Sequence, residues 1–218
     1  MGKNILVVAA TAKEIDPFIE LIRTAGINNV DILISGIGLT ASTYHLAKQL
    51  ALKKYDLVMQ AGVAGSFDVR IPLGAVVAVN QDAIADQSVV ELQKLKTLFE
   101  LDLVPQDQYP YKKGWLINPN RQILKKTKLK IVTGISVNQI STSSQMIKFY
   151  RDVFAPVTES MEGAALHYVC LMENVPFVQI RSISNYIGER NKKKWDMMES
   201  ITNLNCELIK LIKTFNIQ

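Results

Sequence analysis

Short apolar runs rich in β-branched residues alternate with segments of helical apolar spacing along most of this chain, and no other feature restricts its fold as much. Because strands that alternate with helices form sheets covered by helices, we expect one α/β domain spanning residues 1–218. The predicted strands are Asn4–Ala10, Val30–Ser35, Leu57–Ala61, Ala75–Asn80, Lys130–Gly134, a short strand before Met161 and Phe177–Ser184, and the predicted helices are Glu14–Ala25, Thr40–Leu52, Ser144–Val153, Gly163–Glu173 and Met198–Phe215.

Residues 81–127 interrupt this alternation. Acidic residues, aromatic residues and Pro105, Pro110 and Pro119 are mixed there. One helix, Val89–Leu101, is predicted within the segment.

Composition narrows the class of protein. Hydrophobic residues make up 48% of the chain and charged residues 21%, as in soluble globular proteins. No apolar run approaches the ~20 residues that span a bilayer, and the N-terminus lacks the apolar region of a secretion signal, so we expect no membrane association. Cys170 and Cys206 do not have metal-site spacing, and there are only two histidines; we expect no metal and a reducing, cytoplasmic location.

The net charge of +5 does not by itself indicate a partner. The lysine pairs and the triplet Lys192-Lys193-Lys194 are scattered along the sequence, whereas a nucleic-acid site gathers basic residues on one surface with aromatic residues between them. We therefore expect no nucleic-acid partner. Attraction of a small anionic molecule is equally compatible with the charge.

Polar or glycine-rich segments follow several predicted strands. Ligands of open α/β sheets bind outside the carboxyl ends of the strands, so these segments are the candidate sites. Gly36-Ile37-Gly38 lacks the third glycine of a dinucleotide fingerprint, because residue 41 is Ala41, and it follows the second strand rather than the first. A tight turn near a small polar ligand and a purely structural turn both fit it. The other candidate segments are Thr11–Glu14, Gly62–Gly65, Met161-Glu162 and Arg181–Asn185.

Two glutamates lie at predicted helix starts. Glu14 suits the positive end of a helix dipole, a contribution of about 0.3–1 kcal/mol, and by itself favours a structural role. Glu162 is followed by small residues, Gly163-Ala164-Ala165, which allow other groups to approach closely. A carboxylate in that position is a natural acceptor for sugar hydroxyls, and helix capping fits it as well.

Taken together, these elements resemble the nucleoside phosphorylase/nucleosidase superfamily, in the same order from about residue 4 to residue 212. Within the superfamily the chain looks like its hydrolases, the methylthioadenosine/S-adenosylhomocysteine nucleosidases and, more closely, the futalosine hydrolases. The similarity is weakest over residues 87–127. It rests on Ala10–Glu14, Gly62–Gly65, Glu159–Ala165 and Val175–Asn185.

The resemblance implies a three-layer α/β/α fold with a central mixed sheet and cleavage of an N-glycosidic bond without a metal or other cofactor. It implies that Glu14 activates water, that Met161 and Glu162 hold the ribose, and that Asn185 contacts the purine. Ser184 and Arg181 fall on supporting positions, Val63 on the ribose side, and Val137 and Asn138 on the segment that lines the base pocket. It also implies a homo-oligomer, at least a dimer, because in this superfamily a neighbouring subunit commonly completes the pocket.

Two positions depart from relatives. Gln60 stands where phosphorylases carry a phosphate-binding arginine, and Val63 where a hydroxyl residue is usual, so we expect water rather than phosphate as the nucleophile. Asn185 stands where adenine-specific nucleosidases carry an aspartate. An amide can donate to the N7 and O6 acceptors of hypoxanthine, which favours a 6-oxopurine nucleoside.

These departures favour hydrolysis of futalosine, which carries hypoxanthine and a 5′ extension ending in a benzoate. Phe99, Tyr109, Tyr111 and Trp115 provide either walls for that aryl tail or a cover for the sheet or an oligomer interface. The loop 188–195 is either a cover near the base or a basic surface turn. The alternatives are a methylthioadenosine/S-adenosylhomocysteine or aminodeoxyfutalosine nucleosidase, a phosphorylase, and a non-catalytic nucleoside-binding protein of the same fold.

Overall fold

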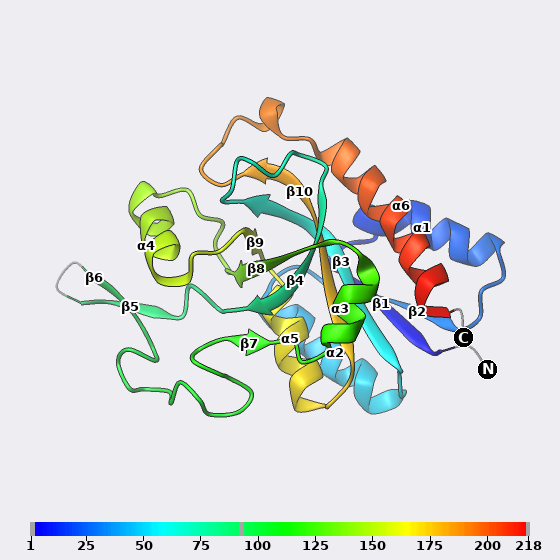
Figure 1. Cartoon of the computed structure of the whole chain (residues 1–218), viewed down its shortest axis with the longest axis horizontal. Coiled ribbons are helices and arrows are strands. Elements are labelled where there is room, and N and C mark those ends of the chain that lie inside the picture. Colours follow the sequence, from blue (N-terminus) through cyan, green and yellow to red (C-terminus); the bar gives the residue numbers. More distant parts are fainter. Residues whose placement is uncertain (1–2, 92–93, 217–218) are drawn as a thin grey trace.

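The computed structural model describes residues 3–91 and 94–216 (Figure 1). Its strands are β1 (Ile5–Ala9), β2 (Val30–Ile34), β3 (Leu57–Ser66), β4 (Val76–Asp82), β5 (Ser88–Glu91), β6 (Lys94–Thr97), β7 (Leu116–Ile117), β8 (Lys130–Ser136), β9 (Thr158–Ser160) and β10 (Phe177–Tyr186). Its helices are α1 (Ala12–Thr24), α2 (Leu39–Leu52), α3 (Arg121–Thr127), α4 (Ser144–Phe154), α5 (Gly163–Met172), the 3-10 turn η1 (Lys192–Lys194) and α6 (Met197–Asn216).

The β1 strand shows why helices cover both faces of the sheet. Its side chains alternate between faces. Ile5 and Val7 pack in a cluster with residues of α1 and α6, whereas Leu6 and Val8 pack in a second cluster with residues of α2 and α5. Full burial of each such side chain contributes about 1.5–3 kcal/mol. The predicted three-layer α/β arrangement with a central mixed sheet is confirmed (Figure 1).

The sheet does not stay open. From β3 it continues through parallel β10, antiparallel β4, parallel β8 and parallel β9, and β9 then pairs antiparallel with β3. These five strands therefore form a closed ring, and β1 and β2 extend the sheet from β3.

One edge of β3 changes partner along its length. Residues 57–60 pair with β1, and residues 65–66 pair with β9. Between these pairings, Ala61–Ala64 has no strand partner on that edge among the described residues. The gap opens beside the carboxyl end of β1, where a ligand site is expected in such sheets.

Two sequence-based assignments need correction, and three short elements were not predicted. The helix predicted at Val89–Leu101 is wrong, because Ser88–Glu91 and Lys94–Thr97 are strands that pair antiparallel. Lys94-Leu95-Lys96-Thr97 shows the period-two alternation of a strand, and residues 92–93 lie outside the described ones. Gly62–Gly65 does not follow the third strand, as predicted, but continues it, and the segment is held by its pairing with β10. The short elements β7, α3 and η1 were not predicted, because two to seven residues carry too little periodicity.

Among the described residues, no helix is long and apolar enough to cross a bilayer, and no group of three or more His, Cys, Asp or Glu side chains is arranged to hold a metal ion.

Candidate active site

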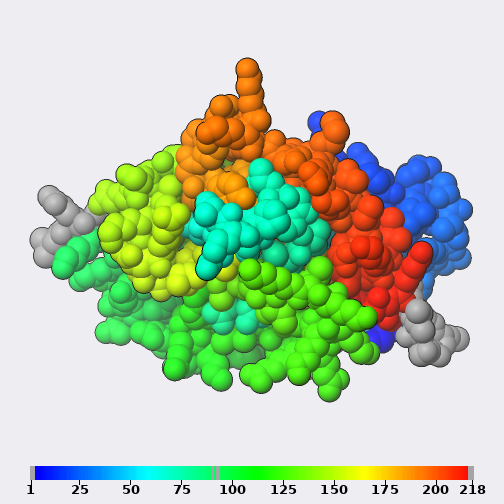
Figure 2. Space-filling model, turned by 45° about the horizontal axis from the view of Figure 1, so that its top comes forward, coloured from blue at the N-terminus to red at the C-terminus, as the bar shows by residue number. Residues whose placement is uncertain are grey.

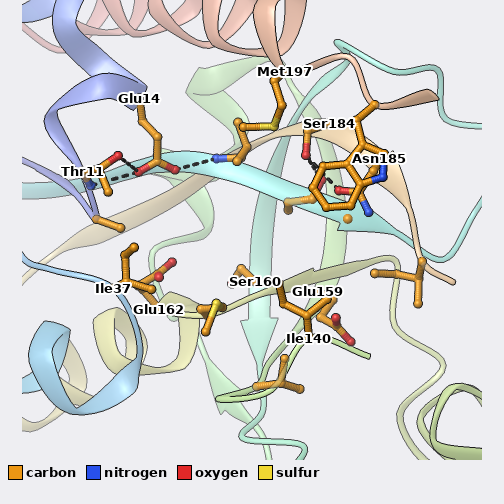
Figure 3. A pocket seen from close by; sticks show the side chains of 18 residues that line it. Thr11, Glu14, Ile37, Ile140, Glu159, Ser160, Glu162, Ser184, Asn185 and Met197 are labelled. Atoms are coloured by element: carbon orange, nitrogen blue, oxygen red, sulfur yellow. Dashed lines mark hydrogen bonds between the residues drawn. The ribbon is translucent and has the colours of Figure 1, made fainter. Parts of the chain in front are cut away.

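A cavity of about 290 Å³ opens at the carboxyl ends of β1, β3 and β10 (Figure 3). The unpaired edge of β3 and the start of α1 form one wall, and β9 and the chain that follows it form another. Figure 3 shows Glu14 and Glu162 at one end of the cavity and Asn185 and Glu159 at the other. Its lining residues are Ala10, Thr11, Glu14, Ile37, Val63, Ala64, Gly65, Val137, Ile140, Glu159, Ser160, Met161, Glu162, Ser184, Asn185, Ile187, Trp195 and Met197.

Glu14 is held in place by backbone and side-chain donors. One carboxylate oxygen accepts from the Thr11 backbone N–H at 3.0 Å and the Thr11 hydroxyl at 3.1 Å, which caps helix α1. The other oxygen accepts from the backbone N–H of Val63 at 3.2 Å, on the unpaired edge of β3. The structural role and the cavity-facing role of Glu14 are therefore compatible.

Glu162 lies at the N-cap of α5, with only 6% of the residue exposed. Its Oε1 accepts from the backbone N–H of Gly38 at 3.2 Å, and Nη1 of Arg181 lies 3.6 Å from its Oε2. Burial raises the pKa of Glu162, and the charge of Arg181 and the Gly38 N–H oppose that rise. The glycine turn at residues 36–38 thus serves as a support for a site carboxylate.

Gln60 explains how Arg181 is held behind the site. Arg181 is 1% exposed, and its Nη2 donates to Oε1 of Gln60 at 2.8 Å. The Gln60 Nε2 in turn donates to the backbone carbonyl of Glu162 at 3.3 Å. Gln60 therefore connects the side chain of Arg181 to the backbone of Glu162, the residue with which Arg181 is paired.

Asn185 has a defined orientation. The Ser184 hydroxyl donates to its Oδ1 at 3.0 Å, and its Nδ2 donates one hydrogen to the Tyr186 carbonyl at 3.3 Å. The amide nitrogen carries a second hydrogen, so Asn185 offers a donor at this end of the cavity.

The glycine that follows Glu162 is required by a buried polar cluster. A Cβ on Gly163 would lie 2.2 Å from both Oδ2 of Asp82 and Nε2 of Gln179. The Asp82 Oδ1 accepts from the Ser136 hydroxyl at 2.9 Å, and Oγ of Ser136 accepts from the Ala164 N–H at 2.8 Å. Burial raises the pKa of Asp82 to about 6.

His167 belongs to the same buried region. It is fully buried in α5, and its Nδ1 donates to the Leu116 carbonyl at 2.8 Å. Burial lowers the pKa of His167 to about 4. No site role was predicted for Asp82, Gln179, His167 or Glu159. The available signal was an acidic residue at the end of β4 for Asp82 and one within the short strand β9 for Glu159.

The structure brings together seven of the nine predicted site residues as cavity lining. Arg181 does not line the cavity but lies behind Glu162. Asn138 is exposed and outside the lining; its backbone N–H donates to Asp86 at 2.5 Å, whereas its neighbour Val137 does line the cavity. The seven lining residues are Glu14, Val63, Val137, Met161, Glu162, Ser184 and Asn185.

The aromatic residues of the irregular segment are not part of this cavity. Trp115 packs against Phe154 with ring centroids 5.7 Å apart, and Tyr111 packs against Phe99 at 5.2 Å and near Tyr168 at 6.2 Å. Within this chain these side chains pack against one another and against α4 and α5, and they do not line the cavity. The loop 188–195 contributes Trp195 to the lining, and the Trp195 indole N–H donates to the Glu189 carbonyl at 3.1 Å.

All the charged residues that line the cavity are acidic. The lining contains three glutamates and neither lysine nor arginine. An anion entering the cavity would meet carboxylates, whereas a group that develops positive charge would be stabilised.

Comparison with known proteins identifies the family. The sequence model that describes the phosphorylase superfamily matches residues 5–215 of this chain. The chain belongs to the phosphorylase superfamily.

Within the phosphorylase superfamily, curated relatives of two kinds are similar to this chain. A futalosine hydrolase of Streptomyces coelicolor is 24% identical over 186 residues, which cover 83% of this chain and 77% of that protein. A 5′-methylthioadenosine/S-adenosylhomocysteine nucleosidase of a Geobacillus species is 28% identical over 180 residues, covering 79% and 75%. These relatives are nucleosidases, which supports the prediction of an N-glycosyl hydrolase.

Solved structures of the superfamily share the fold. A futalosine hydrolase of Helicobacter pylori superposes with a TM-score of 0.78 at 21% identity, covering 98% of both chains. A mutant methylthioadenosine nucleosidase of the same organism, with 5′-methylthioadenosine in its active site, superposes with a TM-score of 0.80 at 23% identity, covering 98% of this chain and 99% of that one.

Proposed function

We propose that this protein is a purine nucleosidase that hydrolyses the N-glycosidic bond of futalosine, releases hypoxanthine and acts in menaquinone biosynthesis. The observation that carries the proposal is the arrangement of one cavity, with Glu14 and Glu162 at one end and the Asn185 amide at the other (Figure 3). The relatives named above support hydrolysis of a purine nucleoside.

Glu14 is the proposed general base. Its donors, Thr11 and the Val63 N–H, orient the carboxylate toward the cavity, where it deprotonates the water that attacks the anomeric carbon. General-base catalysis of this kind contributes about 10²–10⁴-fold in rate.

Glu162 is proposed to accept hydrogen bonds from the ribose hydroxyls. As the ribosyl cation develops, a carboxylate bonded to those hydroxyls stabilises the positive charge, so its contribution is larger in the transition state than in the ground state. Met161 lies beside it in the lining and would contact the sugar ring.

Water is favoured over phosphate as the nucleophile. The cationic clamp that phosphate needs is missing from the lining, and the position expected for an arginine is Gln60, which is committed to Arg181 and the Glu162 backbone. Arg181 itself is paired with Glu162.

The base is proposed to be hypoxanthine. The Ser184 hydroxyl already donates to the Asn185 Oδ1, which turns the amide nitrogen toward acceptors. Hypoxanthine presents acceptors at N7 and O6, and a donor placed there stabilises the departing base without a general acid.

A second candidate is a methylthioadenosine/S-adenosylhomocysteine nucleosidase. The observation that favours it is an apolar part of the lining, where Ile37 is 62% exposed and Ile140 44% exposed, with no cation for a benzoate. Such a surface suits a short apolar 5′ substituent. Asn185 argues against it, because adenine carries an amino group at position 6.

The decisive experiment incubates the protein with futalosine, aminodeoxyfutalosine, methylthioadenosine and inosine, with and without phosphate, and identifies the released base. Hypoxanthine released from futalosine without phosphate is the expected result. Adenine release without hypoxanthine would overturn the substrate, and a strict phosphate requirement would overturn hydrolysis.

We also propose that the protein assembles at least as a dimer in the cytoplasm. Ile37, at the cavity, and Tyr44, on α2, are 62% and 61% exposed, and Ile34, at the end of β2, is 39% exposed. Burial of these side chains by a second copy would lower their contact with water. Sedimentation of the purified protein tests this, and a monomer at micromolar concentration would contradict it.

A further inference from the structure

Glu159 is a cavity-lining carboxylate to which the proposed hydrolysis gives no role. The residue is 5% exposed. Its Oε1 accepts from the Ser141 backbone N–H at 3.0 Å, and its Oε2 accepts from the Ser141 hydroxyl. Each carboxylate oxygen has two acceptor positions, so Ser141 leaves Glu159 able to accept a further hydrogen bond.

The strand register sets Glu159 opposite Asn185. Glu159 of β9 pairs with Gly65 of β3, and Gly65 pairs with Asn185 of β10. The three residues form one row across the sheet, and neighbouring strands are about 4.8 Å apart, so the two outer backbones are separated by roughly the width of a purine and its hydrogen bonds. The middle position is a glycine, and a Cβ there would lie only 2.4 Å from Cδ1 of Ile187, so the missing side chain makes room for Ile187 next to Asn185. A Cβ on Gly65 would lie 3.2 Å from the Asn185 Nδ2.

The two side chains have complementary hydrogen-bonding capacity. The Asn185 amide nitrogen donates, whereas Glu159 in its ionised form only accepts. A 6-oxopurine has acceptors at N7 and O6 and a donor at N1. A 6-aminopurine has an unprotonated acceptor at N1, which an opposing carboxylate would repel.

We propose that Glu159 is a specificity-determining residue that accepts a hydrogen bond from N1–H of a 6-oxopurine base whose N7/O6 edge is held by Asn185. This inference rests on the proposed function, because it assigns a second contact to the same base. An amide that rotates by 180° exchanges its donor and its acceptor and can then bind either kind of purine, so Asn185 alone does not determine which base binds. The second contact, from Glu159, does. Ser141 then acts as a positioning residue for the carboxylate.

A ligand-based double-mutant cycle tests the contact. Hypoxanthine and 1-methylhypoxanthine, which lacks N1–H, are titrated calorimetrically into the wild-type protein and into Glu159→Gln. Because a hydrogen bond to a charged group is about twice as strong as a neutral one, we expect Glu159→Gln to weaken hypoxanthine binding by about tenfold or more and to leave 1-methylhypoxanthine within about twofold.

Ser141→Ala is the matched control, since it removes a donor to Glu159 and leaves the carboxylate in place. If Glu159 only anchors the loop that carries Ser141, both variants will weaken hypoxanthine and 1-methylhypoxanthine equally, and the proposal is wrong. An unchanged ratio between the two ligands in Glu159→Gln would also overturn it.

The base released from futalosine by the wild-type protein separates the two proposals. If hypoxanthine is released but Glu159→Gln keeps the ligand ratio, the role of Glu159 alone fails. If the protein releases only adenine from its nucleosides, the proposed function fails with it.

Discussion

Arg181 lies directly behind Glu162, with its Nη1 3.6 Å from the carboxylate Oε2, and both residues are almost fully buried. The two charges come from β10 and the start of α5, which are joined here through Gln60. The pair therefore links the sheet to the carboxylate that faces the cavity.

Replacing Arg181 with Met should destabilise the fold strongly. The change leaves Glu162 as a buried carboxylate without its cation, and loss of one partner of a buried pair costs about 3–5 kcal/mol. Urea unfolding measures the free energy. The double variant Arg181→Met/Glu162→Gln should recover part of the loss; a double variant as unstable as the sum of the single ones would show that the two charges do not interact.

Glu14→Gln should abolish turnover and leave ligand binding largely intact. The amide keeps an oxygen for the Val63 N–H but cannot take a proton from water, so we expect a loss of about 10²–10⁴-fold in kcat. Single-turnover hydrolysis and hypoxanthine titration measure the two effects. Parallel loss of binding would assign Glu14 a structural role only.

Asn185→Asp should shift preference toward 6-aminopurine nucleosides. A protonated aspartate donates to N7 while its other oxygen accepts from the 6-amino group. The ratio of kcat/KM for futalosine to that for aminodeoxyfutalosine should fall by about tenfold or more, in line with the large discrimination of sites built on buried hydrogen bonds. Ser184→Ala, which frees the amide without changing it, should reduce both rates; an unchanged ratio in Asn185→Asp would place specificity elsewhere.

Two buried groups should give opposite pH dependences of stability. Asp82 has a pKa raised from 3.8 to about 6, so the native state binds its proton more tightly and gains stability as the pH falls from about 6 to 4. His167 has a pKa lowered from 6.5 to about 4, so the unfolded state takes up the proton and stability is lost over nearly the same range.

Asp82→Asn should expose the histidine contribution. With the Asp82 titration removed, stability should fall more steeply than in the wild-type protein between pH 6 and pH 4, by up to about 1.4 kcal/mol for each pH unit. Urea unfolding at pH 6, 5 and 4 measures the slopes. Equal slopes in the two proteins would mean that Asp82 does not titrate in this range.

The local pattern of the sequence was sufficient for the regular elements and for the ends of the strands. The continuous apolar runs of β1 and β10 and the helical spacing in α1 and α6 are local properties, so their positions agree with the structure within a few residues. Glu14, Glu162 and Asn185 were found because each lies near the carboxyl end of a strand or at a helix start, and such positions converge in an α/β sheet. The antiparallel pair β5 and β6 was missed because two short strands stabilise each other only when paired.

Only the tertiary structure determined which of the predicted site residues lie close together. Closure of the strands into a ring sets Glu159 in a row with Gly65 and Asn185, although they lie far apart in the chain. The same closure leaves Asn138 outside the cavity while its neighbour Val137 lines it, a difference of one residue that no spacing reveals. The sequence by itself determined the α/β layers and the residue types at the strand ends, because these depend on local periodicity. The pairing of Arg181 with Glu162 through Gln60 depends on contacts between distant segments, which only the folded chain brings together.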